Sequence, residues 1–147
     1  MKRILITCFI LNIVLFIVGC NVKNNIPDIK NRLYEEWNLQ LPDTTEEIYN
    51  CYQPTFTGRA YQYAVLTCND AALEELKASF VFHSKDSSSS EKLESFFKIM
   101  KADKKYKVDE TYVIDLSENY TYCVLKNSIW LILNESSTEL NICIFGY

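Results

Sequence analysis

The stretch "NYTYCVLKNSIWLILNESSTELNICIF", residues 119–145, decides the fold class of this chain. Aromatic and aliphatic residues fill three short runs, and turn-forming residues separate them. We expect strands near 119–126, 128–133 and 139–145, joined by tight turns at Asn127-Ser128 and at 135–138. The stretch therefore predicts a three-stranded antiparallel meander.

Upstream of the meander, two runs rich in tyrosine, valine, isoleucine and leucine predict a hairpin. The runs are Glu46 to Tyr52 and Ala60 to Cys68, and Pro54 to Gly58 supplies turn chemistry between them. Thr44 and Glu47 have the spacing of a capping box, so a helical turn is the alternative at the start of the first run.

Three further segments have helical periodicity. The first begins at Asp28, a good capping residue, and ends before Leu41-Pro42, because proline disfavours helix in the residue before it. The second begins at Asn69 or Asp70, and the third in the serine run, where Ser88 and Glu91 have capping-box spacing. Their apolar stripes are Ile29, Leu33 and Trp37; Leu73, Leu76 and Phe80; and Leu93, Phe96, Phe97 and Met100.

The order of elements is helix, two strands, two helices, three strands. This order predicts an α+β fold, in which an antiparallel sheet, made of a two-strand hairpin plus a three-strand meander, packs against two or three helices. With 147 residues, 48% of them hydrophobic, the chain is long enough for one domain with a real core, which we place at 28–147.

Alternation divides the side chains of the meander between two faces. The turns pair Val124 with Leu131, and Leu131 with Ile142. The face we expect under the second and third helices carries Tyr122, Val124, Ile129, Leu131, Leu133, Leu140, Ile142 and Ile144. The opposite face carries Thr121, Cys123, Leu125, Trp130, Ile132, Asn141, Cys143 and Phe145. Either the first helix covers this second face, or Trp130, Ile132 and Phe145 are left as candidate partner-binding residues.

The amino terminus has the pattern of a secretion signal. Lys2 and Arg3 precede an apolar run from Ile4 to Val18. Fifteen helical residues span roughly 22 Å, short of the ~30 Å hydrocarbon core, which disfavours a permanent transmembrane anchor.

The end of that run, Ile17-Val18-Gly19-Cys20, resembles the lipobox of bacterial lipoproteins. The resemblance implies that a peptidase cuts between Gly19 and Cys20, and that the Cys20 thiol carries a diacylglycerol. Residues 1–19 are then the signal peptide, 20–27 a lipidated tether, and the protein sits on the extracytoplasmic face of the cell membrane. Leu33 to Tyr49 is also similar to small uncharacterised lipoproteins of low-GC Gram-positive bacteria, which imply no activity.

The net charge and the residue content argue against nucleic-acid binding, a phosphate-binding loop and a metal site. Removing Lys2 and Arg3 with the signal leaves 13 basic and 19 acidic residues, a net charge of −6, which disfavours nucleic acid as a partner. His83 is the only histidine, and we expect it on the surface; after processing only two glycines remain, too few for a phosphate-binding loop. We therefore expect no metal and no cofactor.

Other residues carry weaker signals. Adjacent carboxylates could serve a sugar hydrolase, but such pairs usually coat solvated faces. The run Lys101 to Lys107 contains four lysines. They could bind anionic lipid or an anionic wall polymer, or they could stay solvated and stabilise the carboxyl end of a helix through its dipole. The carboxylate pairs are Glu35-Glu36, Glu46-Glu47, Glu74-Glu75 and Asp109-Glu110.

Four cysteines, Cys51, Cys68, Cys123 and Cys143, fall in expected strands. Export would permit disulfides, but buried free thiols are the favoured interpretation. Cys123 and Cys143 lie on the outer strands of the meander, too far apart to be bonded to each other.

Together these features favour a membrane-tethered, non-enzymatic binding or interaction module. The alternatives are an envelope hydrolase that uses paired carboxylates on wall or sugar polymers, and an immunity or inhibitor lipoprotein that blocks a specific partner.

The first prediction tests the anchor. Because the peptidase and the lipid transfer both act at the lipobox cysteine, Cys20→Ala should leave the precursor uncut and unlipidated. Mass spectrometry of the membrane fraction measures this, and an intact Met1 in the unaltered protein would contradict the prediction.

Overall fold

The computed structural model describes residue 26, residues 28–134 and residues 136–146. The predicted signal peptide, the lipobox with Gly19 and Cys20, and most of the tether lie outside the described residues.

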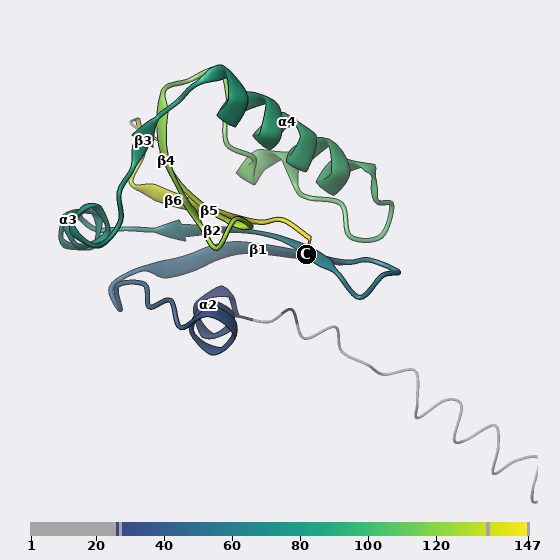
Figure 1. Cartoon of the computed structure of the whole chain (residues 1–147), viewed down its shortest axis with the longest axis horizontal. Helices are drawn as coiled ribbons and strands as arrows, with labels where there is room; N and C mark the ends of the chain where they lie inside the picture. The colour runs from purple at the N-terminus through teal and green to yellow at the C-terminus, as the bar shows by residue number, and fades with distance from the viewer. Residues whose placement is uncertain (1–25, 27, 135, 147) are drawn as a thin grey trace, which may run out of the picture.

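The described chain forms one antiparallel sheet of six strands in the order β1-β2-β6-β5-β4-β3 (Figure 1). The predicted hairpin is β1 (Glu46–Pro54) and β2 (Ala60–Thr67), and the predicted meander is β4 (Tyr120–Leu125), β5 (Ile129–Asn134) and β6 (Glu139–Ile144). They join because β2 pairs with β6, from Gln62 opposite Ile144 to Thr67 opposite Glu139. A two-residue strand, β3 (His83–Ser84), is added at the edge beside β4. The α+β prediction is confirmed.

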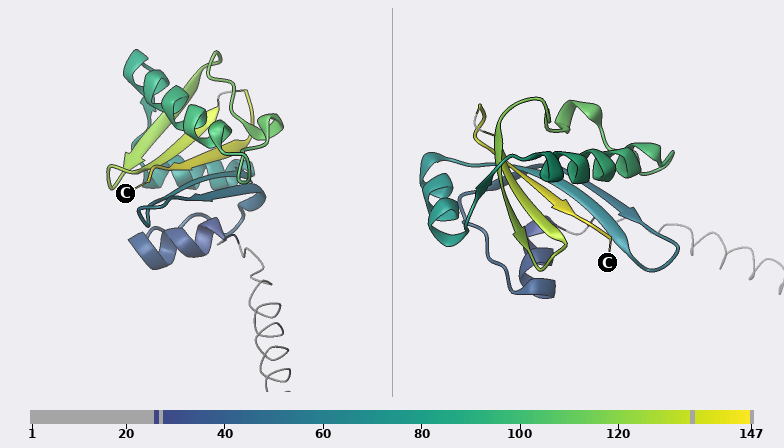
Figure 2. Two further views of the ribbon diagram at one scale, coloured as in Figure 1. Left: turned by 90° about the vertical axis from the view of Figure 1, so that its right-hand side faces the viewer. Right: turned by 45° about the horizontal axis from the view of Figure 1, so that its top comes forward.

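Helices lie on both sides of this sheet. The first and second helices, α2 (Ile29–Trp37) and α3 (Asp70–Ser79), lie on one side, and the third, α4 (Ser87–Ala102), lies on the other with the short 3-10 helix η1 (Glu110–Tyr112) (Figures 1 and 2). The sheet is therefore the middle layer of three, and both of its faces are buried.

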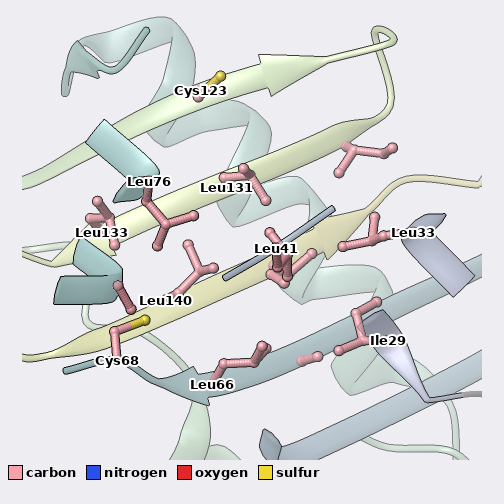
Figure 3. Close-up of a cluster of buried hydrophobic side chains, with 14 of the residues drawn as sticks. Ile29, Leu33, Leu41, Leu66, Cys68, Leu76, Cys123, Leu131, Leu133 and Leu140 are labelled. Atoms are coloured by element: carbon pink, nitrogen blue, oxygen red, sulfur yellow. The ribbon is translucent and has the colours of Figure 1, made fainter. Parts of the chain in front are cut away.

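Two separate clusters fill the two interfaces. The aliphatic core, on the side of α2 and α3, consists of Ile29, Leu33, Leu41, Ala64, Leu66, Cys68, Ala72, Leu76, Cys123, Ile129, Leu131, Leu133, Leu140, Ile142 and Ile144 (Figure 3). The aromatic core, on the side of α4, consists of Cys51, Tyr63, Val65, Leu93, Phe96, Phe97, Met100, Val108, Ile114, Tyr120, Trp130, Ile132 and Cys143.

The predicted register of the meander is right for β5 and β6 but wrong for β4. Leu131 pairs with Ile142 as expected, whereas Val124 pairs with Trp130 instead of Leu131. The β4–β5 turn contains three residues, and both Lys126 and Asn127 adopt positive φ angles, of 52° and 62°. A shift of one residue turns every side chain of a strand to the other face. Cys123 therefore belongs to the aliphatic core.

The predicted covering of the two faces is also corrected. The aliphatic face of β5 and β6 was expected under α3 and α4, but it lies under α2 and α3. The opposite face was expected to be covered by α2 or left open, but it lies under α4. The reason is β3, which runs along the sheet edge between α3 and α4. At β3 the chain crosses the edge of the sheet, so α3 before it and α4 after it lie on opposite faces (Figure 2).

Side-chain caps start the helices. The Asn31 amide donates to Asp28 Oδ1 at 2.9 Å, and the Ala72 amide to Asn69 Oδ1 at 2.8 Å, as predicted. For α4 the predicted box of Ser88 and Glu91 is wrong: Asp86 accepts from the Ser89 amide at 2.6 Å, and Ser89 Oγ accepts from the Asp86 amide at 3.0 Å. The carboxylate of Asp86 is the stronger acceptor for an exposed helix amide.

The alternative of a helical turn at Thr44 and Glu47 is not realised. Glu47 belongs to β1, and its carboxylate accepts a hydrogen bond from the Ile29 amide at 3.0 Å. The first strand therefore helps to hold the amino-terminal turn of α2.

A buried tyrosine ties the aromatic core together. The Tyr63 hydroxyl lies 2.6 Å from both Asn141 Oδ1 and the Tyr112 carbonyl oxygen, and it accepts from the Ile114 amide at 3.3 Å. Tyr63 is fully buried and Asn141 nearly so. Burial raises the pKa of Tyr63, so the hydroxyl keeps the proton with which it donates.

The second prediction concerns this hydroxyl. Tyr63→Phe leaves the polar groups around it without their shared partner, and the free energy of unfolding should fall by about 1–3 kcal/mol. Urea denaturation measures the change. Tyr34→Phe, the same substitution at a side chain that is 59% exposed, is the matched control and should change stability little. Equal losses in the two variants would contradict the role assigned to Tyr63.

Candidate binding groove

A groove of about 570 Å³ opens beside the first turns of α4, where the helix meets the meander. It is lined by Ser88, Ser89, Lys92, Tyr122, Val124, Asn127, Trp130 and Phe145. Two of the three predicted partner-binding residues, Trp130 and Phe145, are therefore brought together here. The third, Ile132, is fully buried in the aromatic core and is not available to a partner.

Aromatic rings form the floor of the groove. Tyr122 stacks on Trp130 with 5.1 Å between ring centroids and 13° between planes, and Phe145 lies 5.7 Å from Trp130. Trp130 is only 5% exposed, whereas Val124 on the neighbouring strand is 40% exposed. The apolar surface that a ligand could contact therefore comes mainly from the residues around Trp130.

A single basic side chain stands over this floor. Lys92 Nζ lies 5.8 Å from the centroid of the Trp130 ring, within range of a cation–π interaction. Its ammonium group gives the groove a positive charge above an apolar base, which suits a ligand with an apolar group next to a negative one.

The amino-terminal turn of α4 is already satisfied by the chain itself. Asp86 accepts from the Ser89 amide and from the Tyr122 hydroxyl, the latter at 3.0 Å. These two hydrogen bonds, the amide first, hold the pKa of Asp86 below its usual value. The helix end is therefore occupied by an internal carboxylate, and the positive charge of the groove comes from Lys92.

A second hollow, of about 550 Å³, lies between α4 and the chain around η1. Its polar lining alternates in charge, with Glu94, Lys98, Lys101, Glu110 and Asp115. Glu110 is paired with Lys107 at 2.9 Å, and this lysine lowers the pKa of Glu110. We assign no ligand to this hollow, because its lining carries charges of both signs.

The four carboxylate pairs lie on different elements: α2, β1, α3 and the start of η1. Glu36 pairs with Arg32 at 2.8 Å, Glu74 with Lys77 at 3.6 Å, and Asp109 accepts from the Thr111 amide at 3.0 Å. The hydrogen bonds from Thr111 lower the pKa of Asp109. A general acid in sugar hydrolysis needs a raised pKa, and the pKa of Asp109 is shifted in the opposite direction.

His83 lies on the surface, and four cysteines lie in the interior. His83 is exposed on β3, with its ring centroid 6.0 Å from that of Tyr122. Cys51, Cys68, Cys123 and Cys143 are free and buried, so the favoured interpretation of buried thiols is confirmed. Cys123 and Cys143 are not bonded, and they point to opposite faces of the sheet.

The described residues contain neither a cluster of metal ligands nor a membrane-spanning helix. No group of three or more histidine, cysteine, aspartate or glutamate side chains within 28–134 and 136–146 is placed to hold a metal ion. None of the helices in the described part of the chain has the length and hydropathy to cross a bilayer. Comparisons with models of protein families, with curated proteins and with solved structures found no match to this chain.

Lys92, Ser88 and Tyr122 line the groove but are not among the residues predicted to bind a partner. Lys92 follows Ser88 by four positions, so both lie on one side of a helix, and this spacing is visible in the sequence. The sequence does not show that this helix covers the face with Trp130. That placement depends on the pairing of β3 with β4.

The third prediction follows from the buried thiols. Burial raises the pKa of all four cysteines, most strongly that of the fully buried Cys143. In the native protein these four should resist iodoacetamide at pH 8, and in urea all four should be alkylated; peptide mapping measures both. Because their pKa values are raised in the folded state, the free energy of unfolding should also fall as the pH rises above about 8.5. Rapid native alkylation of any of the four would contradict the prediction.

Proposed function

We propose that this chain is a lipoprotein, held at the extracytoplasmic face of the cell membrane through Cys20, whose globular part is a binding module and not an enzyme. The anchor part rests on the sequence of the signal and of Ile17-Val18-Gly19-Cys20. The binding part rests on one observation, the groove with an aromatic floor beneath Lys92.

The groove has the properties of a recognition site. Its volume of about 570 Å³ falls within the roughly 300–1,000 Å³ usual for ligand sites, and four of its eight lining residues are aromatic or aliphatic. Tyrosine and tryptophan are enriched where proteins bind partners, because they combine apolar area with a polar tip.

The occupant we favour is a segment of another protein with an apolar side chain beside an acidic one. The apolar side chain would lie on Tyr122, Phe145 and Val124, and the carboxylate would face Lys92. Val124 supports a macromolecular partner, because it extends the apolar surface out of the groove toward the edge of the sheet, where β4 has only the two-residue β3 beside it.

The hydrolase alternative is less well supported. Several members of the carboxylate pairs serve in ion pairs and helix caps, and the pKa values of Asp109 and Glu110 are lowered. An immunity or inhibitor lipoprotein is one form of the proposed function, in which the bound segment belongs to the protein that is blocked.

The fourth prediction tests the groove in cells. A photo-crosslinking amino acid at Val124, in the lipidated protein, should give an adduct of discrete mass, because this side chain borders the groove. The same amino acid at Ile48 is the matched control: Ile48 is also 40% exposed, and it lies on β1 at the other edge of the sheet.

Charge reversal then distinguishes specific capture from chance contact. Lys92→Glu should reduce the Val124 adduct by about tenfold, since an attraction becomes a repulsion and a difference of 1.4 kcal/mol is tenfold. Lys77→Glu, on α3, should leave it unchanged. Equal adducts at Val124 and Ile48, or an adduct indifferent to Lys92→Glu, would contradict binding in the groove.

A further inference from the structure

The β1–β2 turn presents an unburied aromatic side chain. Phe56 has an exposed fraction of 111%, the largest of any apolar side chain in the described part of the molecule. The turn around it is well bonded: the Thr55 amide donates to the Arg59 carbonyl at 2.7 Å, and the Gly58 amide donates to the Thr55 carbonyl at 3.2 Å. Gly58 has a φ of 78°, a conformation that favours glycine. The hairpin therefore holds Phe56 outward at its tip.

A basic segment lies beside the same end of the hairpin. The chain after α4 turns around Asp103, whose carboxylate accepts from the Lys105 and Tyr106 amides at 2.7 and 2.8 Å. This turn contacts β1, because the Cys51 thiol donates to the Tyr106 carbonyl at 3.3 Å. Figures 1 and 2 show the β1–β2 turn and the chain after α4 at one end of the molecule.

The charges at this end are unlike those of the rest of the protein. Lys104, Lys105 and Arg59 are all exposed here. Asp103 offsets one of these three positive charges, which leaves these four residues with a net charge of +2, whereas the processed chain as a whole carries −6. An anionic surface would repel most of the molecule and attract this end, so the charge distribution defines an orientation.

We propose that this end of the domain, with Phe56 and its neighbours Arg59, Lys104 and Lys105, docks on the anionic headgroups of the bilayer that holds the lipid anchor. The inference rests on the proposed lipidation of Cys20. The eight residues 20–27 span at most roughly 28 Å, which keeps the domain close to that surface. Phe56 enters the interface between headgroups and acyl chains, and the three basic side chains pair with lipid phosphates.

A fluorescent label measures the docking directly. The full mature lipoprotein is reconstituted into vesicles of phosphatidylcholine, with or without phosphatidylglycerol, carrying Phe56→Cys labelled with an environment-sensitive nitrobenzoxadiazole dye. We expect a blue shift and quenching by lipid-borne nitroxides in the anionic vesicles, and a smaller effect in phosphatidylcholine alone. Ser137→Cys is the comparison label site, since the β5–β6 turn lies at the opposite end of the sheet, and the addition of vesicles should leave its emission unchanged.

Charge-reversal variants test the electrostatic part. The double substitution Lys104→Glu and Lys105→Glu should abolish the shift at position 56, and Lys77→Glu, an exposed lysine of α3, should leave it unchanged. High salt should act like the double substitution, because it screens exposed charges.

The remaining outcomes overturn the proposal in distinguishable ways. A protein that co-sediments with vesicles but shows no vesicle-induced shift at position 56 beyond that at position 137 has its anchor and lacks the docking surface. Failure of the unaltered protein to co-sediment would overturn the anchor and the docking together. A concentration-dependent shift in the absence of vesicles would assign the patch to a second copy of the chain.

Discussion

The pairing of β2 with β6 is the interaction on which the rest of the structure depends. It connects the amino-terminal hairpin to the carboxyl-terminal meander through a ladder that runs from Gln62 opposite Ile144 to Thr67 opposite Glu139. As a result, β2 and β6 become central strands, and nearly all their side chains are buried. A sheet that is apolar on both faces needs cover on both, and this requirement accounts for the three layers.

The two faces are stabilised by different chemistry. The aliphatic core is made of leucine, isoleucine and alanine with two thiols, and α2 is attached over it by Arg32, whose guanidinium donates to Gln62 Oε1 at 2.6 Å and lies 5.4 Å from the centroids of the Trp37 and Tyr52 rings. The aromatic core instead uses ring–ring contacts and the buried hydroxyl of Tyr63, which bonds to Asn141 and to the segment after η1. Directional bonds of this kind fix the position of a segment that has little regular structure of its own.

The surface features proposed to bind arise at the margins of these layers. The groove lies where α4 leaves the edge of the aromatic face incompletely covered, so Trp130 and Phe145 meet Lys92 there. The basic end arises where the turn after α4 reaches back to β1. Both sites combine residues from segments far apart in the sequence, and both depend on α4 being placed over the aromatic face.

The sequence by itself determined three helices and five strands in their order, but not β3 or η1, because caps, turns and periodicity act over a few residues. Asp28 and Asn69 begin their helices, Gly58 closes the hairpin, and the alternation in β5 and β6 assigns Leu131 and Ile142 to one face. Only the tertiary structure decided the register of β4. Its turn to β5 contains three residues with positive φ at Lys126 and Asn127, and no glycine in the sequence indicates that conformation. It also decided which helix covers which face, because that depends on two residues of β3 pairing with a strand almost forty positions away. The groove and the basic end follow from these long-range pairings, and no local pattern encodes them.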